Sequence, residues 1–89
     1  MKSIELFYKE TCPYCQKVLK HLRELGKTIK LRDTRSHPAV VDELITKGGK
    51  KQVPCLMIDD SPLYESDAII VWIEEHAAQL EDLPVNDRM

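Results

Sequence analysis

The chain has 89 residues, of which 43% are hydrophobic and 31% are charged, so it has room for one hydrophobic core and no second domain. This apolar fraction excludes a disordered chain, and 3 Gly with 5 Pro exclude a collagen-like or low-complexity segment. No apolar run approaches the roughly 18 residues of a membrane span, and the first five residues lack the apolar stretch of a signal peptide. We therefore expect a cytoplasmic protein with no membrane partner.

The charges are unevenly distributed along the chain. The net charge is −2, which argues against a nucleic-acid partner. Residues 1–55 nevertheless carry 12 Lys and Arg against 6 Asp and Glu, whereas residues 56–89 carry 1 against 9. The basic first half either favours an anionic ligand or belongs to one of two differently charged solvated faces.

A strand and a helix are predicted at the start of the chain. Residues 4–8 are apolar and partly aromatic, which is typical of a buried strand. From Pro13 to about Leu25, apolar residues recur at spacings of three and four, which indicates a helix with one buried stripe. Pro13 suits the first helical turn, and Gly26 suits the left-handed position that ends a helix.

The rest of the chain is predicted to complete one sheet. The expected elements are a strand over 28–32, a helix from Pro38 to Gly48-Gly49, a strand over 55–58, a turn at 59–61, a short strand at 63–64 and a last helix capped by Ser66. The order β-α-β-α-β-β-α predicts the α/β class, with a single four-stranded mixed sheet flanked by helices and its first two strands parallel. Residues 1–89 would form a single domain whose polar tail, 81–89, is frayed.

The chemistry is expected at Cys12-Pro13-Tyr14-Cys15. The chain has 3 Cys, an odd number that does not suit a secreted disulfide scaffold. The pair follows a predicted strand and opens a helix, where free N–H groups and the helix dipole stabilise a thiolate. Cys12, at the cap, is the natural nucleophile, and Cys15, one turn deeper, is placed to resolve a mixed disulfide. Lys9 would add a positive charge nearby.

A zinc site is the alternative use of such a pair. Structural zinc takes four ligands, and a second pair of cysteines normally follows downstream. Here only Cys55 remains, and His21, His37 and His76 are scattered over predicted helices and turns. We therefore expect no metal site, and the strand-then-helix context favours redox chemistry over an inert pair.

Two segments give the chain its resemblance to a known family. Lys9 to Cys15, together with Val53-Pro54 at the start of a later strand, resembles the active-site region of dithiol (CPYC-type) glutaredoxins, and the resemblance spans roughly residues 3–80. Residues 48–54 look like the segment that leads into that family's cis-proline, and Glu65-Ser66-Asp67 matches the start of its last helix. The resemblance implies a thioredoxin-like fold.

The resemblance also implies how glutathione would bind. In the family the cis-proline, here Pro54, faces the CxxC pair, and the preceding residue, here Val53, pairs its backbone with the cysteinyl part of glutathione. N–H groups at the start of the last helix would take the γ-glutamyl carboxylate, and Lys9, with Lys51 or Gln52, would take the glycyl carboxylate. The implied site comprises the catalytic pair Cys12 and Cys15 and the glutathione-binding residues Lys9, Tyr14, Gln52, Val53, Pro54, Glu65, Ser66 and Asp67.

Plainer interpretations remain open for several of these residues. Pro54 is an ordinary turn residue if its preceding bond is trans, Ser66 caps a helix with or without a ligand, and Tyr14 is a solvent-facing aromatic if no groove forms beside it. Cys55 is either a small buried strand residue or a thiol close enough to the active pair to exchange with it.

One departure from the glutaredoxin pattern concerns the last helix. Glutaredoxins commonly have Gly-Gly before its binding turn, whereas this chain has Tyr64-Glu65. Glu65-Ser66 followed by Ala68-Ile69 is more similar to the N-terminal domain of glutathione transferases, which shares the fold. Glu65 either replaces a backbone contact to glutathione or weakens its binding.

The expected function is reduction of protein–glutathione mixed disulfides, and of protein or small disulfides, with glutathione as cosubstrate and no bound cofactor. The expected partners are glutathione and glutathionylated or disulfide-bonded proteins, and the protein is expected to act as a monomer. The alternatives are a thioredoxin-like disulfide reductase with another electron donor, a module that binds glutathione and an iron–sulfur cluster, and a noncatalytic domain of transferase-like ancestry.

Overall fold

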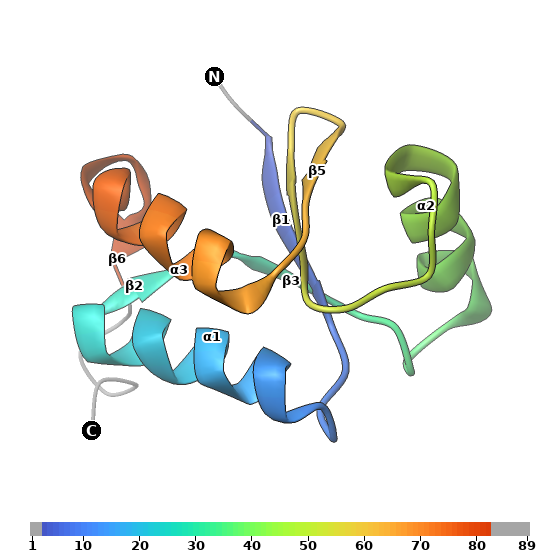
Figure 1. Cartoon of the computed structure of the whole chain (residues 1–89), viewed down its shortest axis with the longest axis horizontal. Coiled ribbons are helices and arrows are strands. Elements are labelled where there is room, and N and C mark those ends of the chain that lie inside the picture. The colour runs from blue at the N-terminus through green and yellow to red at the C-terminus, as the bar shows by residue number, and fades with distance from the viewer. Residues whose placement is uncertain (1–2, 83–89) are drawn as a thin grey trace.

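Four strands form one mixed sheet in the computed structural model, which describes residues 3–82 (Figure 1). Their order across the sheet is β3 (Lys30–Asp33), β1 (Ile4–Tyr8), β4 (Cys55–Ile58) and β5 (Ser61–Leu63). Strand β1 pairs in parallel with β3 and antiparallel with β4, and β5 runs antiparallel to β4. The predicted α/β class and four-stranded mixed sheet are confirmed.

Three helices cover the two faces of this sheet. Helices α1 (Pro13–Leu25) and α3 (Ser66–Glu75) lie on one face, and α2 (Pro38–Gly48) lies on the other (Figure 1). A short 3-10 helix, η1 (Ala77–Gln79), follows α3. Over residues 3–82, none of the helices combines the length and the apolar character that crossing a bilayer would take.

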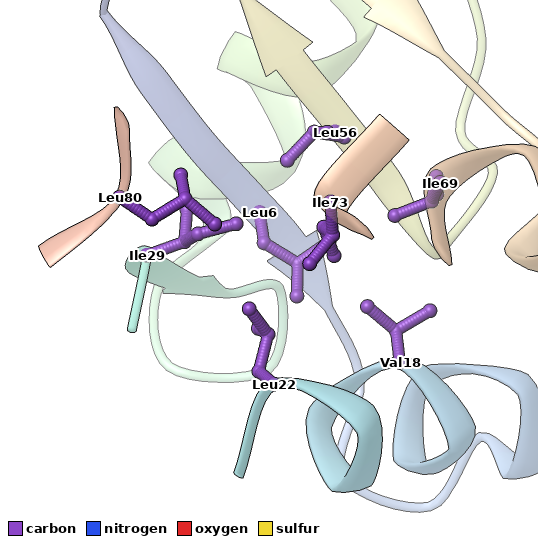
Figure 2. Packing of buried hydrophobic residues seen from close by; sticks show 8 residues of the cluster. All are labelled: Leu6, Val18, Leu22, Ile29, Leu56, Ile69, Ile73 and Leu80. Carbon is purple, nitrogen blue, oxygen red and sulfur yellow. The ribbon is translucent and has the colours of Figure 1, made fainter. Parts of the chain in front are cut away.

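Strand side chains alternate between two hydrophobic clusters. Leu6 on β1 and Leu56 on β4 point toward α1 and α3, whereas their neighbours Phe7 and Cys55 point toward α2, because successive residues of a strand face opposite sides. Figure 2 shows the first cluster, which consists of Leu6, Val18, Leu22, Ile29, Leu56, Ile69, Ile73 and Leu80. The second consists of Phe7, Val40, Leu44, Cys55 and Met57. The end of β1 that leads to Cys12 is therefore held between two packed layers.

A second, two-stranded sheet corrects two of the sequence predictions. The single strand expected over 28–32 is divided into β2 (Lys27–Thr28) and β3, because Ile29 turns its side chain into the core between them. Strand β2 pairs with β6 (Glu81–Asp82), so the tail expected to be frayed from residue 81 is ordered there, next to the buried Leu80. Residues 83–89 lie outside the described part of the chain.

The element ends agree with the sequence predictions in some places and differ in others. Gly26 has a φ of 70°, as expected for the end of α1. Asp59 and Asp60 both have positive φ angles and form the tight turn between β4 and β5. Tyr64 was expected on the last strand of the sheet, but β5 ends at Leu63.

Candidate active site

Cys12 is the N-cap of α1 and follows the short turn after β1. Its backbone is extended (φ −86°, ψ 119°), its N–H donates to the Lys9 carbonyl at 3.0 Å, and its own carbonyl accepts the N–H of Gln16 at 3.0 Å. Pro13 takes the first helical position, where its missing N–H costs no hydrogen bond. The thiol is half-buried and lies at the end of the helix where the N–H groups are free.

The surroundings of Cys12 favour its thiolate. Burial alone would raise the pKa of this thiol, but the other influences outweigh it, and the pKa is lowered. The N–H and the thiol of Cys15 donate hydrogen bonds to the Cys12 sulfur, the N–H of Tyr14 donates another, and the charge of Lys9 acts in the same direction. Cys12 therefore ionises at a lower pH than an ordinary thiol, as a nucleophile requires.

Cys15 has the opposite character. It is completely buried, and burial raises the pKa of its thiol to about 12. The N–H of Lys9 donates to its sulfur at 3.5 Å and works against this rise, whereas the hydrogen bond to Cys12 and the charge on Cys12 add to it. The two free thiols thus form a pair with one easily ionised sulfur and one protonated sulfur.

The loop before β4 carries the predicted cis-proline. The Val53-Pro54 bond is cis, as the resemblance implies. Pro54 is buried, Val53 packs against the cluster under α2, and Gln52 is half-buried. The contacts of these three residues with glutathione remain predictions.

Tyr64 contacts the segment that leads to the cis-proline, a role that was not predicted from the sequence. Its hydroxyl donates to the Gly48 carbonyl at 2.9 Å and lies 3.5 Å from the Lys50 carbonyl oxygen. The Lys50 ammonium lies 4.7 Å from the centre of the Tyr64 ring. The hydroxyl also hydrogen-bonds with the buried thiol of Cys55. A single side chain thus joins the end of α2, the loop over 49–54 and β4.

The start of α3 differs from the sequence prediction by one residue. Glu65, and not Ser66, is the N-cap, since Ser66 is already helical and the first helical bond runs from the Ile69 N–H to the Glu65 carbonyl at 3.0 Å. Glu65 has a φ of 68°, a backbone conformation that glycine adopts readily and other residues avoid. The backbone therefore keeps a glycine-like shape at the position where this chain departs from the Gly-Gly pattern.

The other predicted binding residues are partly brought together. Lys17 on α1 lies 2.6 Å from the Asp67 carboxylate on α3, so this exposed acid is paired across the two helices. Tyr14 is 64% exposed. Lys9 and Lys51 line one open pocket of about 420 Å³, whose other lining residues are Thr11, Thr34, Arg35 and Val41.

Thr34 and Arg35 were not predicted from the sequence. They follow β3 and lie more than twenty positions from Cys12 along the chain. Because β1 and β3 are parallel, the turns after both strands meet at the same edge of the sheet. The predicted parallel pairing of the first two strands was the signal that could have found them.

The third cysteine is a core residue. Cys55 is completely buried in the cluster under α2, and burial raises the pKa of its thiol. This position agrees with the interpretation of Cys55 as a small strand residue. Among residues 3–82, no three His, Cys, Asp or Glu side chains gather where they could hold a metal ion.

Comparisons with known proteins place the chain among two related groups. Residues 6–81 match the family model described as glutathione S-transferase, N-terminal domain. Glutaredoxin 3 of Escherichia coli K12 is 32% identical over 59 residues, which make up 66% of this chain and 71% of that relative. The fold is similar to that of buckwheat glutaredoxin, solved as its complex with glutathione (TM-score 0.61, 21% identity, 88% of this chain and 70% of that one). It is also similar to a Tau class glutathione S-transferase from mango, Mangifera indica (TM-score 0.67, 22% identity, 97% of this chain and 40% of that one).

Proposed function

The chain belongs to the glutaredoxins, thiol oxidoreductases of the thioredoxin fold, and over residues 6–81 to the glutathione S-transferase N-terminal domain family, and we propose that it reduces disulfides at the expense of glutathione. One observation carries this proposal. A half-buried Cys12 with a lowered pKa lies at a helix N-terminus next to a buried, protonated Cys15. This asymmetry supports Cys12 as the attacking residue.

The proposed reaction on a protein–glutathione mixed disulfide uses Cys12 alone. The Cys12 thiolate attacks the glutathione sulfur, a Cys12–glutathione disulfide forms, and the protein sulfur leaves with the electron pair and takes up a proton. A second glutathione thiolate then attacks the glutathione sulfur bound to Cys12. Oxidised glutathione leaves and the Cys12 thiolate returns, so two glutathione sulfurs have been joined and one protein thiol has been freed.

Cys15 enters the proposed reaction on protein disulfides. After Cys12 has formed a mixed disulfide with the substrate, Cys15 loses its proton and attacks the Cys12 sulfur. A Cys12–Cys15 disulfide forms, and the second substrate sulfur leaves with the electron pair and takes up a proton. Two glutathione thiolates then reduce the Cys12–Cys15 disulfide in turn and leave as oxidised glutathione. Two of the causes that raise the Cys15 pKa are the hydrogen bond to the Cys12 sulfur and the charge on it. Both disappear when Cys12 is bonded to a substrate sulfur, so Cys15 ionises more easily at the step that needs it.

Glutathione is proposed to bind between the cis-proline loop and the start of α3. Val53, before cis Pro54, would pair its backbone with the cysteinyl part. The first N–H groups of α3 precede the first helical bond and are free to hold the γ-glutamyl carboxylate, with Ser66 and Asp67 as donors. The remaining proposed contacts are Lys9, Tyr14, Gln52 and Glu65.

The experiment is glutathione-dependent reduction of a small mixed disulfide, coupled to NADPH through glutathione reductase. We expect turnover in the wild type and in Cys15→Ser, and none in Cys12→Ser. The matched control is Cys55→Ala, which removes the other buried thiol and should keep turnover. Turnover in Cys12→Ser would contradict the nucleophile assignment. A folded wild type without turnover would favour another electron donor or a noncatalytic domain, and a visible absorbance band in fresh protein would favour a cluster-binding module.

The remaining parts of the proposal concern the protein in the cell. We propose that the protein is a monomer without a bound cofactor. We also propose that it is located in the cytoplasm, because a reducing compartment keeps a CxxC pair available as thiols. Sedimentation tests the oligomeric state, the absorbance spectrum of fresh protein tests for a bound cofactor, and cell fractionation tests the location.

A further inference from the structure

Helix α2 is attached to the sheet by fewer apolar contacts than the two helices on the other face. Among residues 3–82 it is the only α-helix on its face, whereas α1 and α3 lie together on the opposite face (Figure 1). Val40 and Leu44 are its buried residues, and Ile45 is 42% exposed. Polar contacts must therefore supply part of the attachment of α2.

A series of ion pairs connects α2 to the sheet. Glu5 of β1 is 7% exposed and accepts a hydrogen bond from the Arg32 guanidinium at 3.0 Å. Another N–H group of Arg32 donates to Glu43 of α2, whose second oxygen lies 3.1 Å from the Lys47 ammonium. Lys47 also lies 3.4 Å from Asp60, in the turn between β4 and β5. Arg32 is thus shared by one carboxylate of the sheet and one carboxylate of α2.

The sheet holds Arg32 in position independently of α2. Its guanidinium carbon lies 5.5 Å from the centre of the Phe7 ring, and Lys30 is a second cation 3.4 Å from the Glu5 carboxylate. Hydrogen bonds from Lys47 and Arg32 lower the pKa of Glu43 against the effect of burial, so this carboxylate stays charged. The ion pairs of Glu5 lie within the sheet, and the pair between Arg32 and Glu43 joins the sheet to the helix.

The residue covered by α2 is Cys55. It is completely buried in a cluster with Phe7, Val40, Leu44 and Met57, and two of these four side chains belong to α2. If α2 moved away, this thiol would become accessible, while the cluster of Figure 2, on the other face of the sheet, would stay packed. The reactivity of Cys55 therefore reports on the position of α2.

We propose that α2 opens as a separate unit while the sheet, α1 and α3 stay folded, and that the ion pair between Arg32 and Glu43 controls how often it opens. Segments with few buried apolar contacts open at a lower free energy than the whole domain. Because α2 leads directly into the loop over 49–54, its opening also frees the segment before the cis-proline. This property of α2 does not require the proposed function.

The test follows labelling of Cys55 by a disulfide reagent that releases a coloured thiolate. The protein is the full chain with Cys12→Ser and Cys15→Ala, in which Cys55 is the remaining thiol. Below the unfolding transition, we expect a labelling rate that hardly depends on urea, because a local opening exposes little surface. Added salt should raise the rate by screening the ion pairs.

Glu43→Gln should raise the labelling rate about fivefold, which corresponds to about 1 kcal/mol, because a neutral amide replaces a charged acceptor. The matched control is Asp42→Asn, which removes the same charge from an exposed position of α2. Within residues 3–82, Asp42 forms no ion pair, so this change should leave the rate as it is.

Two outcomes of the labelling experiment would overturn the inference. One is a rate that follows global unfolding at every urea concentration, and the other is an equal effect of Glu43→Gln and Asp42→Asn. Hydrogen exchange in the wild type makes the same comparison without replacing a cysteine. The α2 amides should open at a lower free energy than those of β1, and equal values would also contradict a separate opening.

Discussion

The Tyr64 hydroxyl donates a hydrogen bond of 2.9 Å to the Gly48 carbonyl, and this contact connects two segments on which the proposed glutathione site depends. Gly48 is the last residue of α2 and precedes the loop that contains the cis-proline. Tyr64 lies between β5 and the first residues of α3. The position of one segment therefore constrains the other.

Removing this hydroxyl should loosen the cis-proline loop. Tyr64→Phe leaves the half-buried ring in place but deprives the Gly48 carbonyl of its donor, which should lower the free energy of unfolding by about 1 kcal/mol. If the loop positions Val53 for glutathione, the KM for glutathione should rise while kcat changes little. Urea unfolding measures the free energy of unfolding, and steady-state kinetics measure KM and kcat. The control is Tyr8→Phe, since the hydroxyl of Tyr8 makes no hydrogen bond within residues 3–82. An unchanged KM in folded Tyr64→Phe would contradict a positioning role.

Gly48 should tolerate alanine only when this hydroxyl is absent. A Cβ at Gly48 would lie 2.5 Å from the Tyr64 hydroxyl oxygen, whereas its next neighbours would be 3.5 Å and 3.6 Å away. Gly48→Ala should therefore destabilise the wild type by about 1 to 3 kcal/mol through overpacking. In Tyr64→Phe the same change should be neutral or stabilising by up to about 1 kcal/mol, because alanine favours the helix over glycine. Unfolding of the four proteins in a double-mutant cycle checks this, and additive effects would contradict it.

The reactivity of Cys12 should persist below the pH at which an ordinary thiol loses it. The lowered pKa means that the thiolate forms once the pH rises above this lowered value. Alkylation by iodoacetamide measured against pH should therefore have a midpoint below 9.0, the ordinary thiol value. Cys15→Ala removes the thiol that donates to Cys12 and should move the midpoint upward, further than Lys9→Gln, whose charge is the weaker influence. A larger shift in Lys9→Gln would contradict this order.

Glu65 should be replaceable by glycine with a gain in stability. Its φ of 68° is costly for a side chain by about 1 to 3 kcal/mol, a cost that glycine avoids. We expect Glu65→Gly to raise the melting temperature. The matched control is Glu24→Gly, an exposed site inside α1, where glycine should cost about 1 kcal/mol. A loss of stability in both variants would show that the backbone at Glu65 is not strained. Glutathione affinity of the same variant tests separately whether the carboxylate contacts the ligand.

Much of the fold could be predicted because its signals are local. The apolar spacing in residues 13–25 and the flanking Pro13 and Gly26 depend on neighbours within a few positions, and α1 has the predicted bounds. The position of Cys12 at the start of α1 was also predictable, because it depends on the neighbouring Pro13 and the helix that follows. The start of the last helix differs from the prediction by one residue, because its cap depends on the unusual backbone of Glu65, which no residue type indicates.

The sequence by itself determined the order of the three helices and of the four strands of the main sheet, and the position of the Cys12 and Cys15 pair at a helix N-terminus, because these follow from short-range periodicity and helix-end chemistry. Only the tertiary structure decided which distant side chains meet in the loops around the site. The turn with Arg35 shares a pocket with Lys9 and Thr11 because β1 and β3 pair in parallel, and the Tyr64 hydroxyl donates to the Gly48 carbonyl from a distant part of the chain. Such contacts join residues far apart in the chain, and their distances depend on how all the layers pack together.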